Sequence, residues 1–343
     1  MTTVTDIVNA RRIIDGPSDN LRAISAQRYP WVETLWEQML ANNWVPAQVP
    51  LLRDKKQFAA MSEGCQFGYR SALAFLSNLD AIQVDNLTEN IAVFITDPGV
   101  KKLIARQTFE EAMHNQAYSV IAEELFPGEV LDIYDMARQV PMLAEKNAMI
   151  LAQAREVTLD PTPENKVKAI VSNLILEGVY FFSGFLIFYS IARNTGQMLE
   201  SKDMIRYIQR DELTHLDIFS NAYLSLRQER PELFTPALDA ECRHLFRNAV
   251  ALETAWGRYC IQKGVPGLND EGIGLFIEHR AELCARKIGL GGIYLKARQP
   301  YTWFDDYASV ETMNKTQKNF FEGKNTRYSE ALPQFTSRER EIA

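Results

Sequence analysis

FEEAMHNQAY, residues 109–118, is the stretch that decides the fold, because it places Glu111 and His114 three positions apart. Glu212 and His215 repeat the same Glu-x-x-His spacing about a hundred residues later. Residues three apart are neighbours on a helix surface, so a carboxylate and an imidazole can reach one point between helices. Two such pairs, with one more carboxylate from each of two other helices, form the ligand pattern of a dinuclear metal centre in a four-helix bundle.

Both pairs lie on the apolar face of their predicted helices. At 100° per residue, Glu111, His114 and Tyr118 share a face that also carries leucine and isoleucine side chains. Glu212 and His215 share an apolar stripe in the same way. Burying these polar groups without a common partner is unfavourable. Carboxylate-rich sites with one histidine per metal suit iron or manganese better than zinc.

A third match to the spacing, Glu241 with His244, lies away from the apolar stripe of its helix. We therefore expect this pair to be solvated and to bind no functional metal. The spacing is informative only where it falls on a buried face.

The third helix of the predicted site is the apolar stretch 169–192, which contains Asn173 and Glu177. It is long enough to cross a bilayer. An ionised glutamate at a bilayer centre is unfavourable, so we expect a helix buried inside a bundle, with Glu177 bound to metal. The fourth carboxylate is expected from Asp80, on an apolar face, and Asp85 is the alternative near the helix end.

Composition narrows the class of protein. The chain has 343 residues, 46% of them hydrophobic, and a net charge of −7, which argues against nucleic-acid binding through a basic face. The N-terminus shows no apolar signal segment. Four widely spaced cysteines form no paired motif, which fits a reducing cytoplasm.

The sequence predicts an all-α protein, because no segment shows the sustained alternation of apolar and polar residues that is typical of strands. Asp97 and Pro98 predict a helix start, and Ser62 is a predicted N-cap. Helices are expected at about 30–41, 62–84, 98–127, 129–156, 164–194, 198–227, 231–263 and 270–288. We expect one helical domain, residues 1–320, followed by an extended C-terminal tail, residues 321–343.

FEEAMHNQAY, ILEGVYFFSGF, RDELTHL and the late FFEGKNTRY together resemble the small, radical-generating β subunit of class I ribonucleotide reductase. The resemblance runs from ANNWVP at 41–46 to Tyr328. It implies a ferritin-like helical bundle with additional helices, usually a homodimer. It also implies ribonucleoside-diphosphate reductase activity together with a large catalytic (α) subunit, docked through the C-terminal tail, and activation by O₂ in the cytoplasm.

The resemblance also implies roles for individual residues. The metal ligands would be Asp80, Glu111, His114, Glu177, Glu212 and His215. The radical would reside on Tyr118, inside an apolar pocket formed by Phe181, Phe185 and Ile208. Trp44, Asp211 and Tyr328 would carry electron transfer to the large subunit.

Several alternatives remain open at this point. The metal is expected to be a diiron centre, but relatives of this layout use manganese–iron or dimanganese centres, and some have lost the tyrosine. Manganese loading can require a flavoprotein helper. The tail FTSREREIA, residues 335–343, departs from the acidic-hydrophobic tails common in the family. A ferritin-like oxidase that binds a fatty-acid-like ligand and acts alone, or an iron-storage protein, are the competing functions.

Overall fold

The computed structural model describes residues 3–17, 19, 21 and 23–308. It is a helical bundle, and within those residues the β structure is limited to one isolated bridge between Ile14 and Ile95. The first half of the chain forms α1 (Val4–Ala10), α2 (Trp31–Ala41), η1 (Pro46–Gln48), α3 (Leu52–Phe58), α4 (Glu63–Asp85), η2 (Asn86–Ile91), α5 (Pro98–Leu125), α6 (Val130–Gln139) and α7 (Pro141–Leu159). The second half forms α8 (Pro163–Ile175), η3 (Leu176–Tyr180), α9 (Phe182–Thr195), α10 (Leu199–Glu229), η4 (Pro231–Leu233), α11 (Pro236–Ile261), α12 (Asp270–Lys287) and α13 (Trp303–Ala308).

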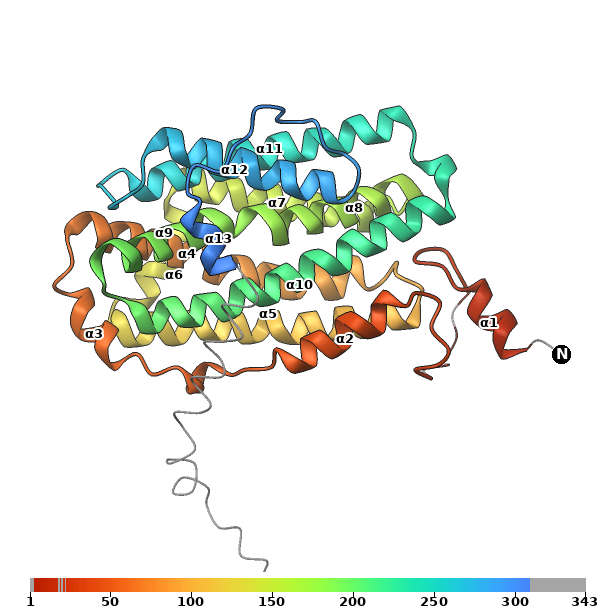
Figure 1. Ribbon diagram of the computed structural model, residues 1–343, viewed down its shortest axis with the longest axis horizontal. Helices are drawn as coiled ribbons and strands as arrows, with labels where there is room; N and C mark the ends of the chain where they lie inside the picture. The colour runs from red at the N-terminus through yellow and green to blue at the C-terminus, as the bar shows by residue number, and fades with distance from the viewer. Residues whose placement is uncertain (1–2, 18, 20, 22, 309–343) are drawn as a thin grey trace, which may run out of the picture.

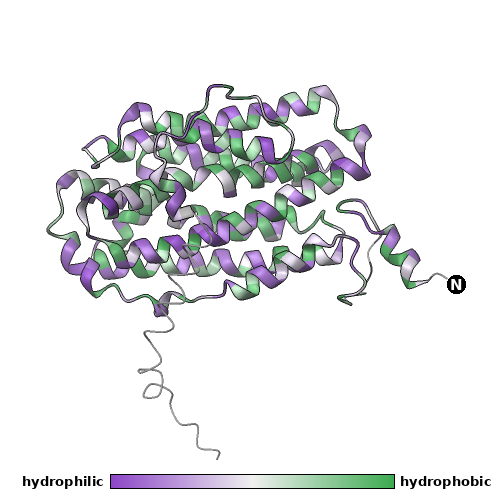
Figure 2. Ribbon diagram, viewed as in Figure 1, coloured by the Kyte–Doolittle hydropathy of each residue, from purple (hydrophilic) through white to green (hydrophobic). Residues whose placement is uncertain are grey.

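Four long helical segments form the centre of the bundle: α4, α5, the segment α8–η3–α9, and α10. The long helices α5 and α10 pack along each other, and α2 packs against both of them (Figure 1). On the other side of the bundle, α11 and α12 form a packed pair that contacts α8, α9 and η3. Most helices carry both hydrophobic and hydrophilic residues along their length, as expected where one face is buried (Figure 2).

The helix starts agree with the capping signals in the sequence. The Asp97 carboxylate accepts hydrogen bonds from the backbone N–H groups of Gly99 and Val100, at 2.8 and 2.9 Å. The Ser62 hydroxyl likewise caps α4 by accepting from the Cys65 N–H. Each cap satisfies donors that a helix N-terminus leaves without an internal partner.

Three expected helices differ from the structure. The predicted helix 129–156 is divided into α6 and α7 at Pro141, because proline cannot donate the helical hydrogen bond and disfavours helical geometry at the preceding Val140. The predicted helix 231–263 begins only at Pro236, where Thr235 provides the N-cap. The stretch 164–194 is interrupted by the π-helical turn η3.

The expected ranges also omit the short α-helices α1, α3 and α13 and the short helices η1 and η2. Helix α13, Trp303–Ala308, falls within the expected domain, residues 1–320. The proposed tail itself, residues 321–343, lies outside the described residues, so the division into domain and tail stays a prediction.

The apolar stretch that resembles a membrane span, Pro163–Thr195, is long and hydrophobic enough to cross a bilayer. Its most apolar window is completely buried inside the protein. This stretch is therefore the central element of the bundle core, as the sequence indicated, and its burial holds Glu177 in the interior.

Candidate metal centre

The six candidate ligands come from all four central helical segments. Helix α4 supplies Asp80, α5 supplies Glu111 and His114, η3 supplies Glu177, and α10 supplies Glu212 and His215. Each of these side chains has a solvent exposure of 0%. Such complete burial of four carboxylates and two imidazoles requires compensation from a shared partner.

Glu111 and Glu212 each turn one oxygen toward each imidazole. His215 Nδ1 lies 3.1 Å from Glu111 Oε1 and 2.8 Å from Glu212 Oε2. His114 Nδ1 lies 3.1 Å from Glu212 Oε1 and 3.7 Å from Glu111 Oε2. These two glutamates therefore lie between the histidines, in positions where a carboxylate can bridge two ions.

Two overlapping groups of ligand atoms define two adjacent positions. Glu111, Glu177, Glu212 and His215 each offer one atom, and these atoms lie within 4.8 Å of one another. Asp80, Glu111 and His114 form a second group by the same measure. Glu111 belongs to both groups, so the geometry fits a dinuclear centre.

Several inward-facing atoms have no hydrogen-bond partner among the described residues. They are both Asp80 oxygens, Glu111 Oε2, His114 Nδ1, Glu177 Oε2 and Glu212 Oε1. His114 Nδ1 and Glu212 Oε1 are close but not aligned for a hydrogen bond. Buried polar atoms are rarely left unpaired, and these are oxygen and nitrogen atoms suited to iron or manganese. The residues present therefore fit a metal pair.

The pKa shifts of the candidate ligands also fit a pair of bound metal ions. Burial raises the pKa of Asp80 and of Glu177 well above the usual value, and the Glu111 charge adds to the effect in both. Burial acts to lower the pKa of both histidines, but the facing carboxylates outweigh it and raise that pKa. Four carboxylates with neutral histidines would balance the charge of two divalent cations.

Each histidine is also held on its outer nitrogen by an acidic residue. His114 Nε2 lies 3.2 Å from Asp211 Oδ2, and His215 Nε2 lies 2.9 Å from Glu110 Oε2. Such contacts fix the ring orientation of metal-binding histidines. The sequence analysis did not identify Glu110 as a partner of His215. A signal was available: an acidic residue directly precedes the ligand glutamate in both motifs, Glu110 before Glu111 and Asp211 before Glu212.

Trp44 contacts Asp211, the acidic residue that holds the outer nitrogen of His114. Its indole N–H donates to Asp211 Oδ2 at 2.7 Å, and its ring lies 6.2 Å from the His114 ring, nearly parallel to it. The structure thus brings together Trp44 and Asp211, which the resemblance assigned to electron transfer, and joins them to His114.

Glu177 is held by three side-chain amides that the sequence reasoning did not identify. Its Oε1 accepts hydrogen bonds from Gln107 at 2.7 Å, from Asn173 at 3.2 Å and from Gln83. Gln83 follows Asp80 by one turn, and Gln107 and Asn173 precede Glu111 and Glu177 by one turn each. Their spacing on the ligand helices was therefore a usable signal. The three donors leave only Oε2 of Glu177 free to face the centre.

Tyr118 is fully buried on α5, one turn after His114. Its hydroxyl has no hydrogen-bond partner among the described residues. Burial raises the pKa of the phenol well above its usual value, and the Asp80 charge adds to that effect. Phe181, Phe185 and Ile208 are likewise fully buried, and the rings of the two phenylalanines lie 5.8 Å apart.

Three other residues that the sequence singled out, Glu241, His244 and Tyr328, are not part of the site as the structure describes it. Glu241 and His244 are exposed on α11, as the angular argument predicted, and Glu241 pairs with Lys168 at 3.5 Å. Tyr328 lies outside the described residues, and its relay role stays a prediction.

Comparison with known proteins identifies the family. Residues 23–300 match the family model for the ribonucleotide reductase small chain. The ribonucleoside-diphosphate reductase β subunit of Halalkalibacterium halodurans is 33% identical, with 92% of this chain and 91% of that protein covered. The β subunit of Treponema pallidum is 31% identical, with 94% and 92% covered.

A solved structure gives the same result for the fold. The ribonucleotide reductase R2 subunit of Clostridium botulinum superimposes with a TM-score of 0.84 at 36% identity, with 87% of this chain and 94% of that chain covered. The ferritin-like helical bundle expected from the sequence is thereby confirmed. By sequence and by fold, the chain belongs to the family of ribonucleotide reductase small chains, the β subunits of ribonucleoside-diphosphate reductase.

Proposed function

We propose that this chain generates and stores a tyrosyl radical and passes the oxidising equivalent to a large catalytic subunit, which reduces ribonucleotides to deoxyribonucleotides. Membership of the family implies a dinuclear metal site and a large partner subunit. The observation that carries the proposal is the set of unpaired ligand atoms facing one another beside a buried tyrosine.

The proposed metal ligands are Asp80, Glu111, His114, Glu177, Glu212 and His215. With these side chains a pair of iron or manganese ions would supply redox chemistry with O₂. Diiron is our first expectation, with manganese–iron and dimanganese as alternatives. Glu111 and Glu212 would contribute to both halves of the centre, because each directs one oxygen toward each histidine.

Tyr118 is the proposed radical residue. It would give up one electron and its phenolic proton, and the resulting radical would persist because water is excluded. The complete burial of Tyr118, Phe181, Phe185 and Ile208 supports this role. The phenolic proton would pass to Asp80, whose charge acts on the phenol and whose two oxygens have no hydrogen-bond partner among the described residues.

Electron transfer between this chain and the large subunit would pass through Trp44, Asp211 and His114. The indole-to-carboxylate hydrogen bond of 2.7 Å and the carboxylate-to-imidazole contact of 3.2 Å make a continuous connection. This connection favours the reductase role over an oxidase that acts alone, because a self-sufficient oxidase needs no route to a partner. We propose that Tyr328 in the tail continues the route.

We further propose that the chain forms a homodimer, works in the cytoplasm and docks to the large subunit through residues 321–343. A synthetic peptide of residues 321–343 should then compete with the whole chain for the large subunit. Sedimentation of the whole chain tests the dimer.

The central test combines activity with spectroscopy. The whole chain is loaded anaerobically with iron(II) or manganese(II), exposed to O₂, and assayed for ribonucleoside-diphosphate reduction with and without a large subunit of the same family. We expect turnover only with the large subunit, together with an organic radical signal in the electron paramagnetic resonance spectrum. Robust reduction by this chain alone would contradict the proposal.

A further inference from the structure

A continuous chain of hydrogen-bonded side chains leads from the protein surface to Glu177. The hydroxyl of Thr158, exposed on α7, donates to Asn90 Oδ1 at 2.7 Å. Asn90 Nδ2 donates to Asn86 Oδ1 at 3.3 Å, and Asn86 Nδ2 donates to Asn173 Oδ1 at 2.8 Å. Asn173 Nδ2 then donates to Glu177 Oε1 at 3.2 Å. We call Asn90, Asn86 and Asn173 the amide ladder.

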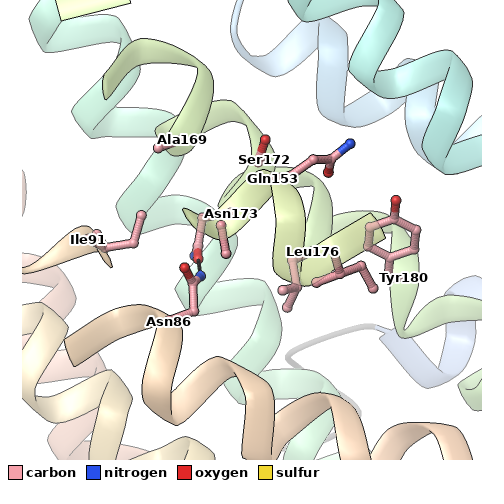
Figure 3. Close-up of a pocket in the computed structure, with 10 residues that line it drawn as sticks. Asn86, Ile91, Gln153, Ala169, Ser172, Asn173, Leu176 and Tyr180 are labelled. Atoms are coloured by element: carbon pink, nitrogen blue, oxygen red, sulfur yellow. Dashed lines mark hydrogen bonds between the residues drawn. The ribbon is translucent and has the colours of Figure 1, made fainter. Parts of the chain in front are cut away.

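A small cavity adjoins the inner part of the ladder. Its volume is about 20 Å³, enough for a water molecule, and Asn86 and Asn173 contribute to its wall. Figure 3 shows these two side chains pointing toward each other from separate helices. The half-buried Ala154 and Ser172 also line the cavity, which places one side of it near the surface.

Two π-helical turns carry the ladder to the candidate ligand. Asn86 and Asn90 belong to η2, and Glu177 belongs to η3. Such turns are uncommon in helices and are frequent at functional sites. The ladder therefore joins the two π-helical turns η2 and η3.

The chemistry of the ladder suits a divalent cation. All six candidate ligands are fully buried, so an ion must cross the interior to reach them. Moving an unshielded charge through apolar surroundings is prohibitive. The side-chain carbonyl oxygens of Asn90, Asn86 and Asn173 are hard ligands of the kind that iron(II) and manganese(II) accept, whereas O₂ is apolar and has no need of them.

A second polar connection leads from the surface to the centre, and unlike the amide ladder it contains a positively charged side chain, Arg106. His215 contacts Glu110, which pairs with Arg106 at 3.0 Å, and Arg106 reaches the exposed Asn43 at 2.9 Å. The Arg106 guanidinium would repel an approaching cation. The amide ladder contains no charged side chain before Glu177.

We propose that the amide ladder is the path by which divalent metal ions enter the buried centre, an inference that rests on the proposed metal-binding role of the six ligands. An ion entering beside Thr158 would exchange water for amide oxygens one at a time. It would arrive on the Glu177 side of the centre, next to His215.

The test measures the rate of metal uptake rather than enzyme activity. The metal-free whole chain is mixed anaerobically with manganese(II), and the disappearance of the signal of free manganese(II) is followed by electron paramagnetic resonance. Ala154→Phe narrows the cavity, and Asn90→Leu removes the outermost amide of the ladder. Neither residue is a candidate ligand or contacts Glu177.

Each variant has a matched control on α7. Ala152→Phe places the same ring at an exposed position of the helix that carries Ala154. Asn147→Leu removes an asparagine whose exposure of 8% equals that of Asn90, and Asn147 takes no part in the ladder. Circular dichroism and thermal unfolding confirm that all four variants are folded.

We expect Ala154→Phe and Asn90→Leu to slow uptake by about tenfold or more, which equals about 1.4 kcal/mol of added barrier, with unchanged final metal content. The controls should keep the rate of the unaltered chain. Unchanged rates in both folded path variants would overturn the proposal while leaving the metal centre intact. An unaltered chain that binds no metal would instead overturn the proposed centre, and the path with it.

Discussion

Glu177→Gln is predicted to change stability in opposite directions with and without metal. The substitution keeps the Oε1 atom that accepts hydrogen bonds from Gln83, Gln107 and Asn173. It replaces Oε2, the atom that faces the centre without a partner among the described residues, with an uncharged amide nitrogen. The variant therefore removes one negative charge and one ligand atom but keeps the surrounding contacts.

The magnitude in the metal-free protein follows from the separation of the carboxylates. Ligand atoms of Glu111, Glu177 and Glu212 lie within 4.8 Å of one another. At an effective dielectric constant of about 20, two like charges at that distance repel by about 3 kcal/mol. Two effects offset part of this repulsion: Glu177 can take up a proton because burial raises its pKa, and the histidines, whose pKa values are also raised, attract the carboxylates. We expect Glu177→Gln to stabilise the metal-free chain by about 1–3 kcal/mol, seen as a rise in Tm of several degrees.

The metal-bound protein should show the reverse. Loss of a charged ligand should weaken metal binding by about 100-fold or more, equivalent to about 2.7 kcal/mol at saturating metal. The rise in Tm on adding manganese(II) or iron(II) should shrink accordingly, as differential scanning calorimetry can measure. Glu123→Gln, on the exposed face of α5, is the control and should leave both Tm values unchanged. If Glu177→Gln destabilised the metal-free and metal-bound forms equally, Glu177 would be a structural residue and the metal assignment would fail.

Three further predictions concern other parts of the chain. Tyr118→Phe removes only a hydroxyl without a hydrogen-bond partner among the described residues, so fold and metal content should persist while the organic radical signal and turnover vanish; full activity would favour a metal-centred oxidant. His244→Ala should leave metal content and activity unchanged because His244 is exposed on α11, and a loss of metal would refute the angular argument. Lys146→Met leaves the fully buried Glu253 without its cation and should destabilise the chain by about 3–5 kcal/mol in urea unfolding. Combining it with Glu253→Gln should restore most of that loss, and a double variant as unstable as the single one would contradict the reasoning.

The sequence was sufficient to locate the candidate ligands, because the helical period shows from the spacing of two residues whether their side chains share a face of the helix. Glu111 and Glu212 fall on apolar faces, and a lone Glu177 in an apolar helix needs a partner in any fold. The same angles separated His244 from the buried histidines, and the structure places His244 at the surface. These inferences need only the helical period and the unfavourable burial of charge.

The interactions around the ligands were less accessible from the sequence. Glu110 and Gln107 lie on α5 beside Glu111, but helical spacing alone does not show which residue of another helix each will meet. The π-helical turn η3 changes the angular register near Glu177, and helical periodicity does not indicate where such a turn begins. The break at Pro141 was predictable in principle, since proline disfavours continuation of the preceding helix.

Hydrogen bonds restrain the carboxylate of Glu177 but not that of Asp80, although both lie at the same candidate centre. Neither Asp80 oxygen has a hydrogen-bond partner among the described residues, whereas Glu177 has one oxygen fixed by three N–H donors. In the proposed centre, Asp80 could turn either oxygen toward the His114 side, whereas Glu177 would offer only its unfixed Oε2 on the His215 side. Ions differ in how strictly they impose a coordination geometry, so the two positions are unequal in selectivity. We therefore expect metal titration of the chain to proceed in two resolved steps, because neutral amides restrain a carboxylate at one position and not at the other.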